Sequence, residues 1–230
     1  MQALDVATEI EALWRVCGDL FVEAIPPRTS GSEDRLRSEL IFCLLGGYGV
    51  PFELAASASA RAEQLNVFDP GWDEPSLENA IREELAAPQF EPRRLNGSLR
   101  RYRFPHRKAQ LIVSARRWLA EREPIYEFLR GTTCEAQRRF VLCECPGVGL
   151  KTASWILRNL GLASRLAVVD VHVVRALQRV GRIDSVRLPR DYGLAETAFL
   201  KWSDDLAAPA AAFDLFLWEW QRGLFTSVDV

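Results

Sequence analysis

Apolar residues recur at steps of three and four along most of this 230-residue chain, which is the spacing of one face of a helix. The segment 3–25 shows this best, because its apolar positions are Ile10, Leu13, Trp14, Cys17, Phe21 and Ala24. Alternation of apolar and polar residues, the pattern of a strand, is nearly absent. Further helices are predicted at 33–45, 51–65, 76–86, 104–121, 124–130, 134–144, 150–160, 171–180, 188–206 and 209–222.

The ends of these helices carry the residues that helix boundaries favour. Pro26 and Pro27 follow the first helix, and Ser32 is placed to cap the second. Asp170 is placed to cap the helix that runs to residue 180, and Gly181 closes that helix. Short loops between amphipathic helices predict an all-α protein with two helical lobes. The expected lobes are 1–28 plus 161–230, and 29–160.

The composition is that of a globular protein, with a net charge of −2. No apolar run reaches the roughly 18 residues of a membrane span, and no signal-peptide pattern opens the chain. We therefore expect a cytoplasmic protein without membrane contact. The slight negative charge argues weakly against a protein that coats nucleic acid, but it allows a local basic surface.

A local basic surface is predicted between residues 93 and 108. Its basic side chains are Arg93, Arg94, Arg100, Arg101, Arg103, Arg107 and Lys108. Aromatic rings are interleaved at Tyr102 and Phe104, and an acidic stretch lies just upstream. A solvated surface loop would show the same pattern, so composition leaves both interpretations open.

Residues 145–151 read Cys-Pro-Gly-Val-Gly-Leu-Lys and lie between two predicted helices. Glycines at 147 and 149 permit a tight hairpin, after which the second helix begins with unpaired N–H groups. These groups and the helix dipole favour an anion such as a phosphate. A plain helix–helix turn is the competing interpretation, because Pro-Gly is a common turn dipeptide.

Lys151 and Asp170 are the two candidate chemical groups near this hairpin. Lys151 falls in the first turn of its helix, where the dipole disfavours the ammonium form and so favours a nucleophilic amine. Asp170 follows in Val-Val-Asp-Val-His, and a capping carboxylate is rigid enough to stabilise a developing positive charge. Exposed lysines and capping aspartates also occur without catalytic roles.

The region 140–182 resembles the helix-hairpin-helix superfamily of DNA glycosylases, and within it the 8-oxoguanine DNA glycosylase/AP lyase branch. The segments Pro-Gly-Val-Gly-Leu-Lys-Thr-Ala-Ser and Val-Asp-Val-His carry this resemblance, with the family's spacing between lysine and aspartate. Weaker similarity at 35–45, 102–116 and 214–223 is to the compact, archaeal-type members.

The resemblance implies a bifunctional enzyme with its active site in a cleft between two helical lobes. Lys151 would attack the anomeric carbon of a flipped nucleotide, expel the damaged base and form a Schiff base, and β-elimination would then nick the strand. Asp170 would stabilise the cationic sugar and help to deprotonate Lys151. The implied partner is double-stranded DNA with a damaged base, bound by a monomer that associates with the nucleoid.

The resemblance also places the remaining contacts. The residues expected to bind the DNA backbone are Gly147, Val148, Gly149, His172, Arg107 and Lys108. The base pocket is expected to contain Trp218 and Phe42, because Trp218 lies off the stripe that Phe213, Phe216 and Trp220 share. No cofactor is expected, since no cysteine beyond 145 could hold an iron–sulfur cluster. A structural Na⁺ or K⁺ could be held by the carbonyl groups of Cys143, Cys145 and Val148.

Two alternatives stay open at this point. The first is a glycosylase for another damaged base, such as an oxidised pyrimidine or an alkylated purine. The second is a non-catalytic helix-hairpin-helix protein that only binds the DNA backbone. The presence of both Lys151 and Asp170 argues against the second alternative.

Overall fold

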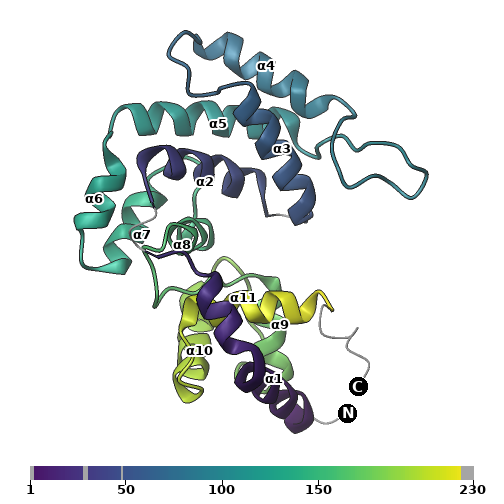
Figure 1. The fold of residues 1–230 in the computed structure, drawn as a ribbon, viewed down its shortest axis with the longest axis vertical. Helices are drawn as coiled ribbons and strands as arrows, with labels where there is room; N and C mark the ends of the chain where they lie inside the picture. The colour runs from purple at the N-terminus through teal and green to yellow at the C-terminus, as the bar shows by residue number, and fades with distance from the viewer. Residues whose placement is uncertain (1–2, 28–30, 48, 224–230) are drawn as a thin grey trace. The chain divides into compact units, whose positions relative to one another are not determined.

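The computed structural model describes residues 3–27, 31–47 and 49–223, and in these residues the named secondary structure is entirely helical. A single antiparallel bridge between Phe90 and Arg100 closes the loop that precedes α5. The predicted all-α class is therefore confirmed. The helices (Figure 1) are α1 (Ala3–Ala24), α2 (Glu33–Leu45), α3 (Phe52–Gln64), α4 (Glu74–Ala86), α5 (Pro105–Ala120), α6 (Ile125–Gly131), α7 (Glu135–Cys143), α8 (Leu150–Asn159), α9 (Val171–Arg179), α10 (Tyr192–Asp205) and α11 (Ala210–Gln221).

Most helix ends lie where local sequence signals place them. The Ser32 side chain accepts the N–H of Arg35 at 3.2 Å and caps α2 as predicted. The start of α10 was predicted wrongly, because the helix begins at Tyr192 and not at residue 188. The carboxylate of Asp191 accepts the N–H of Arg187 at 2.8 Å, which holds the preceding residues in a turn. Leu188 also precedes a proline, and that position disfavours helical backbone angles.

The chain divides into two compact units, which are 1–30 with 133–139 and 153–230, and 31–132 with 140–152. The predicted boundaries differ from this division in residues 29–30, 133–139 and 153–160. Three arginines from the two longer stretches explain the difference there, because each binds a group of the first unit. Arg138 donates to the carbonyl of Leu162, Arg139 pairs with Glu196, and Arg158 pairs with Asp214.

The core of the first unit is aromatic and surrounds Phe213 of α11. This ring meets Trp14 of α1 edge-on at a centroid distance of 5.3 Å and Trp202 of α10 at 5.0 Å. It also stacks on Phe199 and on Phe216. The C-terminal aromatic cluster in the sequence is thus mainly core packing, as the helical stripe predicts.

The second unit is built on α5, which packs against α2 and α4, while α3 covers α2. Its buried core includes Leu77 and Ile81 from α4, Ile112 from α5, and Phe90 from the loop between them. No helix in the described ranges is both long and apolar enough to cross a membrane.

Candidate functional site

The hairpin that joins α7 to α8 is held tightly inside the second unit. The N–H of Val148 donates to the carbonyl of Cys145 at 3.0 Å, and the Val148 side chain is buried. Gly147 has a φ of +86°, and a Cβ atom there would lie 2.8 Å from Cδ2 of Leu111 and 3.2 Å from Cδ2 of Leu44. Gly147 is therefore required both by its backbone angle and by the space it leaves.

The N–H groups of Gly147 and Gly149 are the hairpin groups that suit a phosphate. Both residues are exposed, and within the described part of the chain neither N–H has a hydrogen-bond partner. They precede the positive end of α8, which favours an anion. The N–H of Val148 is used by the turn itself, so the predicted DNA contact of Val148 would not go through this group.

Lys151 is the second residue of α8 and is half-buried. The chain has three lysines, at 108, 151 and 201, so few side chains can serve as an amine nucleophile. Lys201 is exposed on α10 of the first unit, whereas Lys108 lies in the interior of the second. Of these three lysines, Lys151 is the one in the first turn after the hairpin and remains the candidate nucleophile.

Lys108 is not placed to bind DNA, although the sequence analysis expected it to do so. The side chain is 4% exposed, and its ammonium donates to the carbonyls of Leu44 and Gly46 at the C-terminal end of α2. Burial lowers the pKa of Lys108 to about 8. Lys108 therefore serves the packing of α5 on α2, and a phosphate has no access to its charge.

Arg107, the neighbouring residue, points to the surface and remains a candidate contact. It lines an open groove of about 700 Å³ together with Gln110 and Ser114 of α5 and with Pro146 and Gly147 of the hairpin. The guanidinium of Arg107 and the free hairpin N–H group therefore lie along one groove. These two groups suit a negatively charged backbone, whereas Glu74 and Glu78 of α4, which also line the groove, do not.

Asp170 caps α9 in the first unit, as predicted. Its Oδ1 atom accepts the N–H groups of His172 at 2.7 Å and Val173 at 3.0 Å. Two hydrogen bonds to one oxygen fix the orientation of the carboxylate and leave Oδ2 for another partner. Asp170 is half-buried, so the group is both rigid and accessible.

His172 is held by the last turn of α11. The side chain of Gln221 donates to the carbonyl of His172, and its Oε1 atom lies 3.4 Å from Nδ1 of the imidazole. This pair of contacts orients the ring and ties the first turn of α9 to α11. An oriented imidazole could donate to a phosphate, so His172 remains a predicted backbone contact.

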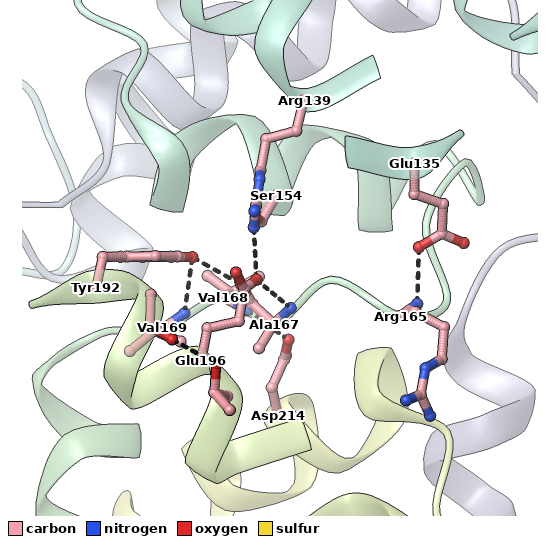
Figure 2. A network of polar contacts seen from close by, with 12 residues as sticks. Glu135, Arg139, Ser154, Arg165, Ala167, Val168, Val169, Tyr192, Glu196 and Asp214 are labelled. Atoms are coloured by element: carbon pink, nitrogen blue, oxygen red, sulfur yellow. Dashed lines mark hydrogen bonds and ion pairs between the residues drawn. The ribbon is translucent and has the colours of Figure 1, made fainter. Parts of the chain in front are cut away.

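Three polar side chains around the segment that leads to Asp170 are not among the residues predicted from the sequence. Tyr192, Glu196 and Asp214 are buried and point at the peptide groups of residues 167–169 (Figure 2). A sequence signal for one of them exists, because Asp214 is the single charged residue in the apolar run 206–218. An isolated acid in such a run indicates a buried pair, but the run does not reveal its partner.

The partner of Asp214 is Arg158 of α8, and their side chains form a buried ion pair. Burial raises the pKa of Asp214 to about 6, against the opposite effects of Arg158 and of the Val168 N–H. The Arg158 guanidinium and the Val168 N–H thus both favour the ionised form of this buried carboxyl.

The two predicted base-pocket residues lie in different units. Trp218 of α11 is half-buried, and the guanidinium carbon of Arg222 lies 4.4 Å from the centroid of its ring. Phe42 of α2 is half-buried and packs edge-on against Phe52 at 5.5 Å. Each ring thus has one packed side and some exposed surface.

The chain is similar in sequence to known DNA glycosylases. A family model described as Ogg-HhH, 8-oxoguanine DNA glycosylase, matches residues 75–208. The 8-oxoguanine DNA glycosylase/AP lyase of Metallosphaera sedula is 30% identical over 122 residues, which are 53% of this chain and 59% of that protein. The protein of the same name from Korarchaeum cryptofilum is 26% identical over 196 residues, which are 84% of this chain and 82% of that protein.

A solved structure has the same fold as this chain over almost the whole length of both proteins. It is the crystal structure of the Methanocaldococcus jannaschii 8-oxoguanine glycosylase/lyase in complex with a 15mer DNA containing 8-oxoguanine. The TM-score is 0.71 at 21% identity, and the match covers 94% of this chain and 96% of that chain. The match to the Metallosphaera protein, by contrast, covers less than two thirds of its length.

Proposed function

Because the chain belongs to the 8-oxoguanine DNA glycosylase family, we propose that it removes 8-oxoguanine from duplex DNA and then cleaves the strand as an AP lyase. One observation carries this proposal beyond the fold. The chain has a lysine in the first turn after a glycine hairpin and a carboxylate fixed as the N-cap of α9. A protein that only held the DNA backbone could use Asp170 as a helix cap, but it would not need the combination of this carboxylate with an amine in the first turn after the hairpin.

The proposed chemistry begins with the Nζ atom of Lys151. The neutral amine attacks C1′ of the damaged nucleotide, and the N-glycosidic bond breaks. The base leaves with its electron pair and takes up a proton, which balances the proton that the attacking nitrogen gives up. Opening of the sugar ring gives a Schiff base between C1′ and Nζ. Loss of a proton from C2′ then expels the 3′ phosphate by β-elimination and breaks the strand on that side.

Asp170 stabilises the positive charge that builds up on the sugar as the base departs. Its Oδ1 atom is fixed by two N–H groups of α9, so no reorientation is needed when the charge appears. A fixed anion is worth more in such a step than a mobile one, because its reorganisation has already occurred.

The backbone of DNA would be held mainly by Gly147, Gly149, Arg107 and His172. Their groups are neutral N–H donors or cations, and all can meet phosphate oxygens without reading the base sequence. The chain would bind the duplex as a monomer.

A structural Na⁺ or K⁺ would be held by backbone carbonyl groups at the end of α7 and in the hairpin, which are those of Cys143, Cys145 and Val148. Carbonyl oxygens near the negative end of a helix suit a monovalent cation.

Borohydride trapping tests the proposed function directly. The native protein is incubated with duplexes that carry 8-oxoguanine, an oxidised pyrimidine, an alkylated purine or no lesion. We expect a covalent adduct with the 8-oxoguanine duplex, because reduction fixes the Schiff base. An adduct with another lesion alone would change the assigned substrate, and binding without any adduct would leave a DNA-binding protein that lacks the chemistry.

Replacing Trp218 by alanine tests the proposed base pocket. Stacking of an aromatic ring on a base is worth about 1–3 kcal/mol, so Trp218→Ala should slow excision of 8-oxoguanine about 10- to 100-fold. Cleavage at a pre-formed abasic site should hardly change, because no base has to be held there. Both rates are measured under single-turnover conditions.

Trp220→Ala is the matched control on the same helix. Trp220 is half-buried like Trp218, and its Nε1 lies 3.4 Å from Oε1 of Glu9. Both alanine variants therefore remove a half-buried indole ring from α11. We expect Trp220→Ala to affect the two substrates alike. If Trp218→Ala also lowers both rates equally, Trp218 supports the fold and the pocket lies elsewhere.

A further inference from the structure

The residues that lead to Asp170 form a buried segment without secondary structure. Residues 166–169 precede α9, and all four side chains are buried. Such a segment has no helical or sheet partner for its backbone, yet buried N–H and C=O groups must be satisfied. Side chains have to supply the missing partners.

Three side chains from α10 and α11 supply them, on three consecutive residues (Figure 2). Glu196 accepts the N–H of Ala167 at 3.3 Å, and Asp214 accepts the N–H of Val168 at 2.9 Å. The hydroxyl of Tyr192 accepts the N–H of Val169 at 3.3 Å and donates to the carbonyl of Ala167 at 2.7 Å. We call Tyr192, Glu196 and Asp214 the clamp.

Charged partners hold the clamp in place. Glu196 pairs with Arg139, whose side chain also reaches the hydroxyl of Ser154 at 3.4 Å. Asp214 pairs with Arg158, as described above. Burial raises the pKa of Tyr192, so its hydroxyl keeps the proton that it donates to Ala167. Each carboxylate of the clamp is thus held by an arginine as well as by a peptide N–H, and the buried Tyr192 is held by its two hydrogen bonds.

We propose that the clamp positions the carboxylate of Asp170 for base excision, by holding the three peptide groups immediately before it in one conformation. The inference rests on the proposed function, because it assigns the clamp a role in the reaction of Asp170. Downstream, Gln221 holds the carbonyl of His172. The carboxylate is therefore anchored on both sides along the chain, upstream by the clamp and downstream by α11.

Tyr192→Phe is the variant that tests this proposal. It removes one oxygen atom, keeps the ring in the core and leaves no buried charge without a partner. A misplacement of about 1 Å can cost about 100-fold in rate, and two of the four clamp hydrogen bonds remain. We expect single-turnover excision to slow about tenfold, with unchanged affinity for a duplex that carries an abasic-site analogue.

Phe199→Leu is the matched control for a loss of stability. Phe199 lies on α10 with Tyr192, is fully buried, and stacks on Phe213 at 5.6 Å. The two variants are compared at a temperature where both are folded, as checked by thermal denaturation. Phe199→Leu should lower the melting temperature at least as much as Tyr192→Phe, yet excise at nearly the native rate.

A double-variant cycle shows whether Tyr192 acts through Asp170. If it does, Tyr192→Phe should have almost no further effect once Asp170 is asparagine, because coupled residues are not additive. A tenfold loss that persists in the Asp170→Asn background would overturn the proposal. An equal loss in Phe199→Leu would overturn it too, by assigning Tyr192 to the fold alone.

These experiments distinguish a failure of the positioning role of the clamp from a failure of the proposed function. If Asp170→Asn slows excision and Tyr192→Phe does not, the positioning role falls and the proposed function stands. If the native protein excises no base, or if Asp170→Asn is without effect, the proposed role of Asp170 falls and the clamp loses its function with it.

Discussion

Replacing Lys151 by glutamine is expected to abolish both release of 8-oxoguanine and borohydride trapping. Glutamine has a similar length but no amine, so neither attack on C1′ nor a Schiff base can occur. Binding of the lesion duplex should remain largely intact, because the N–H groups of Gly147 and Gly149 are unchanged. The measurements are single-turnover base release, adduct formation on a denaturing gel, and equilibrium binding.

Lys201→Gln is the control for that result, since it removes an exposed lysine of α10, 50 residues further along the chain. We expect this variant to form the adduct at the native rate. With only three lysines in the chain, peptide mapping of the native adduct can assign the attached residue directly. An adduct that persists in Lys151→Gln would move the nucleophile to Lys108, Lys201 or the terminal amine.

Asp170→Asn is expected to slow base excision by about 100-fold or more, the scale seen when a fixed electrostatic group is removed. The amide oxygen can still accept the N–H groups of His172 and Val173, and asparagine caps helices as well as aspartate does. The melting temperature should therefore stay close to that of the native protein. The excision rate and the thermal transition are measured on the same preparation.

Asp170→Ala separates the two roles of this residue. Alanine removes the cap as well as the charge, so it should lower the free energy of unfolding by about 1 kcal/mol beyond any effect of asparagine. Excision should be slowed at least as much as in Asp170→Asn. A large fall in the melting temperature of Asp170→Asn, with a normal rate per folded molecule, would show that Asp170 is structural only.

The sequence predicts those parts of the fold that depend on neighbouring residues. The bounds of α2 are found because Ser32 caps its first turn and Gly46 ends it. The capping role of Asp170 is found for the same reason. The assignment of residues 133–139 to the first unit is not found, because Arg139 pairs with Glu196, a residue 57 positions away. Spacing along a helix contains no information about such a partner.

The difference between neighbouring residues and partners that are far apart in the sequence also explains which site residues can be predicted. Gly147 lies in a local motif whose backbone geometry demands a glycine, and Lys151 is found from its place in the first turn after that motif. Lys108 looked like a surface cation, and the structure turns it inward onto carbonyls of α2, more than 60 residues earlier in the chain. Asp214 stands out as a lone acid in an apolar run, but the clamp as a whole cannot be predicted from the sequence, because its members bind peptide groups, which nearly every residue supplies.

The packing of Gly147 gives the two hairpin glycines different tolerances to mutation. Leu44 and Leu111 fill the space around position 147, whereas a Cβ atom at Gly149 would meet nothing within 4 Å. A change at 147 would therefore disturb the interior of the second unit together with the proposed phosphate contact. A change at 149 would alter the proposed contact while leaving that interior intact. Variants that test or tune the proposed DNA contact without destabilising the fold should accordingly begin at position 149.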